Sequence, residues 1–145
     1  MFKKFRRKKA EELEVQMAIT DARLALTKAE LAAKLIDLAG QTSDVAPLND
    51  ANQALKAARE FFGLEKAPME ICLVQVALGD MLFRLGRKEM NRNIIAQAKM
   101  AYRTAITMAS VQGDEALRMD LRAKVKLVDS LLDKGPKTPS LFRAA

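Results

Sequence analysis

The side chains that could carry out catalysis in this chain are almost all carboxylates. The 145-residue sequence has no histidine and one cysteine, so the commonest general base and the commonest zinc ligands are missing. The carboxylates that could replace them are Asp37, Asp80, Glu89, Asp129 and Asp133. Each lies near lysine or arginine, which lowers a carboxyl pKa, whereas a general acid needs a raised one. We therefore predict no catalytic residue, no metal, no cofactor and no enzymatic activity.

The cysteine and the glycines give no other chemistry. Cys72 lies in an apolar run, where a packed thiol is favoured over a reactive one. One cysteine cannot form an intrachain disulfide, and this favours a reducing compartment such as the cytoplasm. The Leu-Gly-Asp and Leu-Gly-Arg triplets at 78–80 and 85–87 lack the pattern of a phosphate-binding loop.

Positive charge is concentrated at the N-terminus. Residues 1–9 hold six cations and no acidic residue, and the formal net charge of the whole chain is +7. Two aromatic rings are interleaved with the cations: the set is Phe2, Lys3, Lys4, Phe5, Arg6, Arg7, Lys8 and Lys9. Residues 10–14 are Ala-Glu-Glu-Leu-Glu, so the apolar core of a secretory signal does not follow.

Three interpretations of this basic tail stay open. Rings and cations together suit an anionic membrane surface, where each cation adds about 1 kcal/mol. A solvated terminus without a partner explains the same residues. Nucleic acid is disfavoured, because the rest of the chain is nearly neutral and offers no basic groove to extend the contact.

Composition and apolar spacing predict an all-α protein of one domain. Half of the residues are apolar, with eight methionines, six glycines and four prolines, which favours helices over strands. No apolar run reaches the 18 residues of a membrane span. We expect a basic tail over 1–9, a helical domain over 10–134 and a flexible tail over 135–145. In the last, Leu141 and Phe142 are part of a frayed end, fold back into an apolar groove, or form a short docking motif.

Five helices are expected within the helical domain. The first spans about 9–39 and ends at Gly40, and the residues before Ala18 project as a free helix. Its core face is marked by Leu13, Met17, Leu24, Leu31, Leu35 and Leu38. The second spans about 49–62, with Asp44, Asn49 or Asp50 as its cap and Gly63 as its end.

The remaining three helices have equally clear limits. The third begins at Pro68 and ends at Gly86, and the fourth begins near Asn91, a good N-cap. The fifth follows Gly113 and ends at Gly135, and it caps the open end of the stack. Gly79 allows the third and fourth helices to approach closely, with Leu82 and Leu85 filling the seam beside it.

Two segments recur at nearly one period. Residues 53–59 match 97–103 at an offset of 44, and residues 35–40 match 81–86 at an offset of 46. Such periods are typical of stacked helical pairs. The stretch 68–109 resembles the tetratricopeptide repeat of bacterial proteins. The matching positions are Pro68, Gln75, Leu78, Gly79, Leu82, Gly86, Ala98, Tyr102 and Ala105.

The resemblance implies a non-enzymatic adaptor or scaffold that binds a segment of another protein in a groove. Placed residue by residue, the groove would be lined by Leu73, Val76, Asp80, Phe83 and Arg84 of the third helix. Two roles stay open for Phe83: it is either an exposed anchor for the partner or a core residue against the first or fifth helix. The alternative function is that of a small helical protein associated with nucleic acid through its basic tail.

Overall fold

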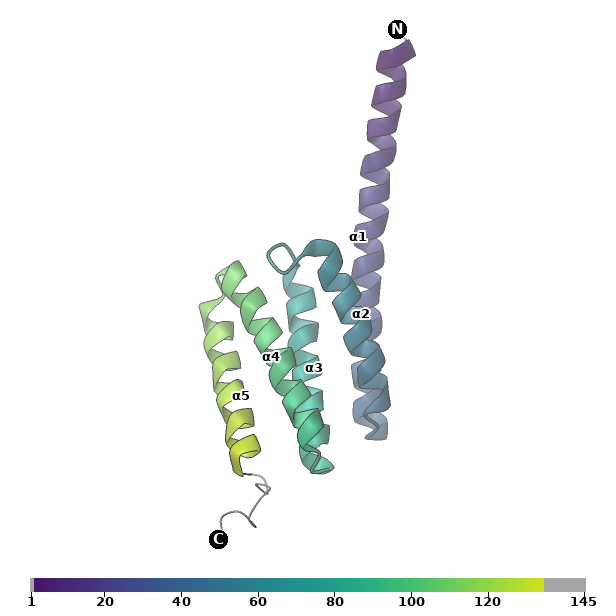
Figure 1. Ribbon diagram of the computed structural model, residues 1–145. Coiled ribbons are helices and arrows are strands. Elements are labelled where there is room, and N and C mark those ends of the chain that lie inside the picture. The colour runs from purple at the N-terminus through teal and green to yellow at the C-terminus, as the bar shows by residue number, and fades with distance from the viewer. Residues whose placement is uncertain (1, 135–145) are drawn as a thin grey trace, which may run out of the picture.

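The structure, a computed structural model, describes residues 2–134, which fold as five helices (Figure 1). The helices are α1 (Phe2–Thr42), α2 (Ala46–Phe62), α3 (Met69–Lys88), α4 (Arg92–Gln112) and α5 (Glu115–Lys134). Successive helices run in opposite directions, which confirms the predicted all-α fold of antiparallel pairs. The expected tail over 135–145, with Leu141 and Phe142, lies outside the described residues.

The helices pack as two pairs and a final helix. Helix α1 pairs with α2, α3 pairs with α4, and α3 also touches both helices of the first pair. Helix α5 packs against α4 at the end of the stack, in the predicted capping position (Figure 1). The segments that recur in the sequence lie on α1 and α3 in one case and on α2 and α4 in the other, so the two pairs are equivalent in position.

Helices α3 and α4 make a close contact at Gly79. A Cβ atom there would lie 2.7 Å from Cδ1 and Cε1 of Tyr102, and both residues are buried. Leu82 and Leu85 are buried in the same seam. The predicted role of Gly79 is therefore confirmed, because no larger residue fits against the tyrosine ring.

Several helix ends lie where the sequence places them. Gly63 and Gly113 follow α2 and α4 with φ of 77° and 75°, a conformation that glycine adopts without strain. The Asn91 side chain accepts hydrogen bonds from the backbone N–H groups of Asn93 and Ile94, as an N-cap should. Asp44 accepts one from the N–H of Ala46, although α2 begins three residues before the predicted start.

Two further glycines predicted to end helices, Gly40 and Gly86, lie inside them, and Gly135 lies outside the described residues. Helix α1 continues through Gly40 to Thr42, and α3 continues through Gly86 to Lys88. A Cβ at Gly40 would meet the end of the Met81 side chain at 2.7 Å, and one at Gly86 would meet Ile95 Cγ1 at 2.8 Å. At Gly86 the new atom would also lie 3.0 Å from the Ile95 backbone nitrogen, so this glycine allows close packing, whereas at Gly40 it would meet only the flexible end of a side chain. Both helices continue past their glycine, so the prediction that the two glycines terminate helices was wrong.

The predicted core face of α1 was also wrong. The buried residues are small or on another face: Ala25, Ala29, Ala32, Ile36 and Ala39. Leu35 is half-buried, whereas the other expected core residues are exposed: Leu13, Met17, Leu24, Leu31 and Leu38. Alanines let α1 lie close to its neighbours, and the leucine positions face away because none of the helices within residues 2–134 covers that side.

The basic N-terminus belongs to α1. The helix begins at Phe2, so residues 2–9 form its first turns and are not a separate tail. Residues 2–21 are all exposed, and this end of α1 projects beyond the other helices (Figure 1). The expected projection of the residues before Ala18 is confirmed.

Candidate functional site

The residues predicted to bind a partner share one side of α3. At 100° per residue, they fall within about a third of the helix circumference. We call this set the α3 face: Leu73, Val76, Asp80, Phe83 and Arg84. Leu73 is 52% exposed, whereas Val76 and Phe83 are half-buried and pack against the core. Asp80 and Arg84 are exposed. The structure therefore brings the five residues together as a partly apolar surface.

Phe83 lies between the two roles that the sequence left open. Its ring packs against buried core residues on one side, and the guanidinium carbon of Arg87 lies 5.4 Å from the ring centroid. A cation at this distance over a ring is an attractive contact. Phe83 is thus neither a freely exposed anchor nor a fully buried core residue.

Replacing Phe83 with alanine should cost an intermediate amount of stability. A fully buried phenylalanine loses about 3–5 kcal/mol on this change, and a surface residue stays within about 0.5 kcal/mol. For a half-buried ring we expect a loss of roughly 1–3 kcal/mol in the free energy of unfolding, measured by urea titration. An unchanged urea midpoint would contradict the packing of Phe83 against the core.

Asp80 is held by contacts within the fold. Its carboxylate accepts a hydrogen bond from the Tyr102 hydroxyl of α4 and pairs with Lys124 Nζ of α5 at 3.0 Å. Lys124 Nζ also lies 5.7 Å from the centroid of the Tyr102 ring. Three helices therefore meet at Asp80, and its charge is already balanced by a cation of this chain.

Burial raises the pKa of the Tyr102 phenol above its ordinary value of 10, and the hydrogen bond to Asp80 raises it further. Because the pKa of Tyr102 is higher in the folded than in the unfolded protein, the contribution of this phenol to the free energy of unfolding is complete below about pH 10. That contribution is lost as the pH rises beyond about 10 and the unfolded chain ionises first. Tyr102 is the one tyrosine of the chain, so phenolate absorbance reports on it alone. We expect phenolate absorbance to appear only together with loss of the helical circular dichroism signal. Phenolate forming near pH 10 in a fully helical protein would contradict the buried hydrogen bond.

The α3 face has positive charge at one edge. Arg84 and Arg87 are exposed, and neither forms an ion pair within residues 2–134. Arg84 lies beside α1, since its Nη1 would be 3.9 Å from a Cβ atom at Gly40. Lys124 Nζ lies 3.0 Å from Asp80 and 3.9 Å from Asp120, so two carboxylates share this cation, and Arg84 and Arg87 make the positive edge of the α3 face.

The carboxylates considered for catalysis are scattered in the structure. Asp129 pairs with Lys99 at 2.7 Å, and Asp37, Glu89 and Asp133 are exposed. Across residues 2–134, no three His, Cys, Asp or Glu side chains are placed to share a metal ion.

Cys72 is fully buried, and burial raises the pKa of its thiol. The predicted packed state of this side chain is therefore confirmed, because a thiol reacts through its thiolate.

A cavity of about 250 Å³ lies on the opposite side of α3 from the α3 face, between α2, α3 and α4. Two polar residues in it, Arg59 and Gln75, were not identified as functional from the sequence. A signal was present: Gln75 is polar on the side of α3 that carries the buried Ile71, Leu78 and Leu82. We call this cavity the α2/α3/α4 cleft.

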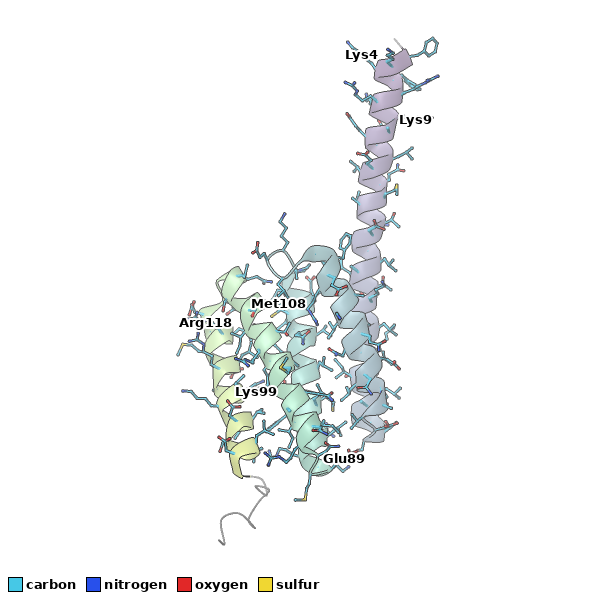
Figure 2. All side chains as sticks on the ribbon, in the orientation of Figure 1. Lys4, Lys9, Glu89, Lys99, Met108 and Arg118 are labelled. Carbon is cyan, nitrogen blue, oxygen red and sulfur yellow. The ribbon has the colours of Figure 1, made fainter. Side chains whose placement is uncertain are left out.

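The cations of the N-terminus lie far from both surfaces. Lys4 and Lys9 point outward from the free end of α1, well away from Glu89 at the other end of the bundle (Figure 2). Phe2 and Phe5 are 81% and 65% exposed, and Lys9 Nζ lies 5.9 Å from the centroid of the Phe5 ring. None of the described helices is both long and apolar enough to cross a membrane.

Comparison with family models, curated proteins and solved structures finds no match to this chain. The class that the fold defines is an all-α protein built from antiparallel helical pairs.

Proposed function

We propose that this protein is a non-enzymatic adaptor or scaffold that binds a segment of another protein on the α3 face. The observation that carries the proposal is the row of partly exposed apolar side chains along α3, Leu73, Val76 and Phe83, which ends beside Arg84 and Arg87, two cations without an ion pair among residues 2–134. Exposed apolar clusters rimmed by polar groups are typical of interaction sites. The resemblance of residues 68–109 to the tetratricopeptide repeat supports the same assignment.

The bound segment should be apolar and acidic. Leu73, Val76 and Phe83 follow one another along α3 and offer apolar surface to aliphatic or aromatic side chains of an extended segment. Arg84 and Arg87 favour carboxylates at the rim, where complementary charge increases the association rate and sets specificity. Asp80 contributes little to this choice because Lys124 already balances its charge.

Selection of peptides from a random library on the immobilised full chain tests this proposal. We expect enriched peptides to combine apolar residues with Asp or Glu, and to bind at least about tenfold more weakly to a Leu73→Asp variant or to an Arg84→Glu, Arg87→Glu variant. Arg103→Glu, on the exposed side of α4, is the matched control and should leave binding unchanged. Enrichment of basic peptides, or equal binding to all variants, would contradict the proposal.

We also propose that the first turns of α1 attach the scaffold to an anionic membrane surface. Phe2 and Phe5 are three residues apart, so their rings lie on the same side of the helix. Cations surround the rings, and the end of α1 extends away from the bundle. A helix of this kind can touch a surface while the α3 face stays open to a partner.

A further inference from the structure

The α2/α3/α4 cleft contains a cation that is held in place by a hydrogen bond and forms no ion pair among residues 2–134. Arg59 of α2 is half-buried, and its Nη1 donates a hydrogen bond to Gln75 Oε1 at 2.5 Å. No carboxylate among residues 2–134 forms an ion pair with it. Of the four other half-buried cations in the described part of the chain, Lys99, Arg118 and Lys124 each have a carboxylate partner, whereas Lys28 of α1 forms no ion pair there.

Gln75 fixes the position of this cation. It is 1% exposed and is the one buried polar side chain in the described part of the chain. Its Nε2 donates to the Ala101 carbonyl at 3.3 Å, so its Oε1 is left to accept from Arg59. Burying an amide is costly unless both ends are bonded, and an aliphatic residue would pack this seam without that cost. The arrangement is explained if the amide serves to hold the guanidinium at the cleft.

The surroundings of Arg59 suit a small anion. Asn52 of α2 and Gln97 and Thr104 of α4 add hydrogen-bonding groups to the cleft, over a floor that includes Leu78 and Leu82. Burial lowers the pKa of the Arg59 guanidinium, against the opposing effect of the neighbouring Glu60 carboxylate. A partly buried guanidinium binds most strongly to a partner that accepts several hydrogen bonds in one plane.

We propose that the α2/α3/α4 cleft binds the carboxylate group of a ligand, with Arg59 as its ion-pair partner and Gln75 as the residue that positions Arg59. A single arginine matches the single charge of a carboxylate, whereas a phosphate dianion calls for further cations. The adjoining depression contains Lys56 and also Glu60, so it adds no net positive charge. The volume of about 250 Å³ suits a carboxylate on a short apolar stem, such as an acidic side chain or a small organic acid. This site is separate from the α3 face, so either proposal can fail alone.

Titration of the full-length protein with propionate, followed by amide NMR, tests the inference. Propionate should shift the amides of Asn52, Arg59 and Thr104 in a saturable way, and propionamide, its neutral isostere, should not. In Arg59→Gln the propionate affinity should fall about tenfold or more, since a charged hydrogen-bonded pair is lost. The matched control, Arg103→Gln, removes one exposed charge from α4 and should bind like the parent.

Two further arms complete the test. If Arg59→Gln loses its helical signal, Arg59→Lys keeps the charge without the planar fork and should still bind propionate more weakly than the parent. A capped peptide with one glutamate that binds more tightly than propionate would assign the site to a protein partner, and equal affinity would assign it to a free small acid. Tighter binding of inorganic phosphate, equal effects of propionate and propionamide, or unchanged binding by Arg59→Gln would overturn the carboxylate assignment.

Discussion

Replacing Gly79 with leucine is expected to lower the free energy of unfolding by about 3 kcal/mol or more, the upper end for overpacking a core. Even the first carbon of the new side chain would lie 2.7 Å from two atoms of the Tyr102 ring. That ring cannot move aside easily, because it is buried and its hydroxyl is bonded to Asp80. Chemical denaturation followed by circular dichroism measures the loss.

Alanine variants at two glycines separate the contact from helix propensity. Gly79→Ala gains up to about 1 kcal/mol of helix propensity, yet we expect it to be less stable than the parent because the ring must shift. Gly40→Ala gains the same propensity, and its new carbon meets only the flexible end of Met81, so it should be as stable as the parent or more so. A Gly79→Ala variant at least as stable as Gly40→Ala would contradict the close packing of α3 on α4.

Removing residues 2–9 is expected to weaken binding to vesicles rich in phosphatidylserine by about a hundredfold or more. Six cations leave with this segment, and each contributes about 1 kcal/mol near an anionic surface. The helical signal of the bundle should persist, because the removed residues are exposed and project beyond the other helices.

Two further measurements extend this test: vesicle binding by a Phe2→Ser, Phe5→Ser double variant, and binding of duplex DNA by the parent and the truncated protein. The serine variant keeps every charge and should bind more weakly than the parent but more tightly than the truncated protein. Neutral vesicles should bind none of the three. Vesicle binding that survives the truncation would contradict the membrane proposal. DNA binding that is lost on truncation, without any vesicle binding by the parent, would support the nucleic-acid alternative instead.

The number of helices and most of their limits could be predicted because local signals fix them. Gly63, Gly113 and Asn91 act through their own backbone conformation or side chain, so the sequence around each position is sufficient. Gly40 and Gly86 were misread because their role depends on Met81 and Ile95, which lie on other helices. In the sequence, a glycine that ends a helix and a glycine that packs inside one both follow an apolar run, so the two cannot be distinguished.

The core face of α1 could not be predicted for a related reason. Leucine and alanine stripes both recur at helical spacing along this helix, and size favours the leucines as core. The structure buries the alanine stripe, because α1 lies close to α2 and α3, and leaves Leu24, Leu31 and Leu38 exposed. Which stripe is buried depends on how near the neighbouring helices approach, and that is a property of the whole stack.

The α3 face and the α2/α3/α4 cleft differ in how far the sequence reveals them. The five residues of the α3 face were placed by the resemblance to the tetratricopeptide repeat, and helical geometry puts residues at these spacings on one side of α3. The cleft depends on the hydrogen bond between Arg59 and Gln75, which are 16 residues apart on different helices. Their pairing has no local signature apart from one polar residue on a buried face.

Site-specific photocrosslinking in the cells that make the protein tests the central claim most directly. A photoreactive amino acid at position 73 should form a crosslink to one protein, through a segment that contains apolar and acidic residues. The crosslink should disappear when Arg84 and Arg87 are changed to glutamate. The same group at position 119 on α5, where Met119 is 67% exposed, should give no such product. Crosslinks of equal yield from positions 73 and 119, or a product at 73 that survives the two glutamates, would contradict the binding of an acidic partner segment on the α3 face.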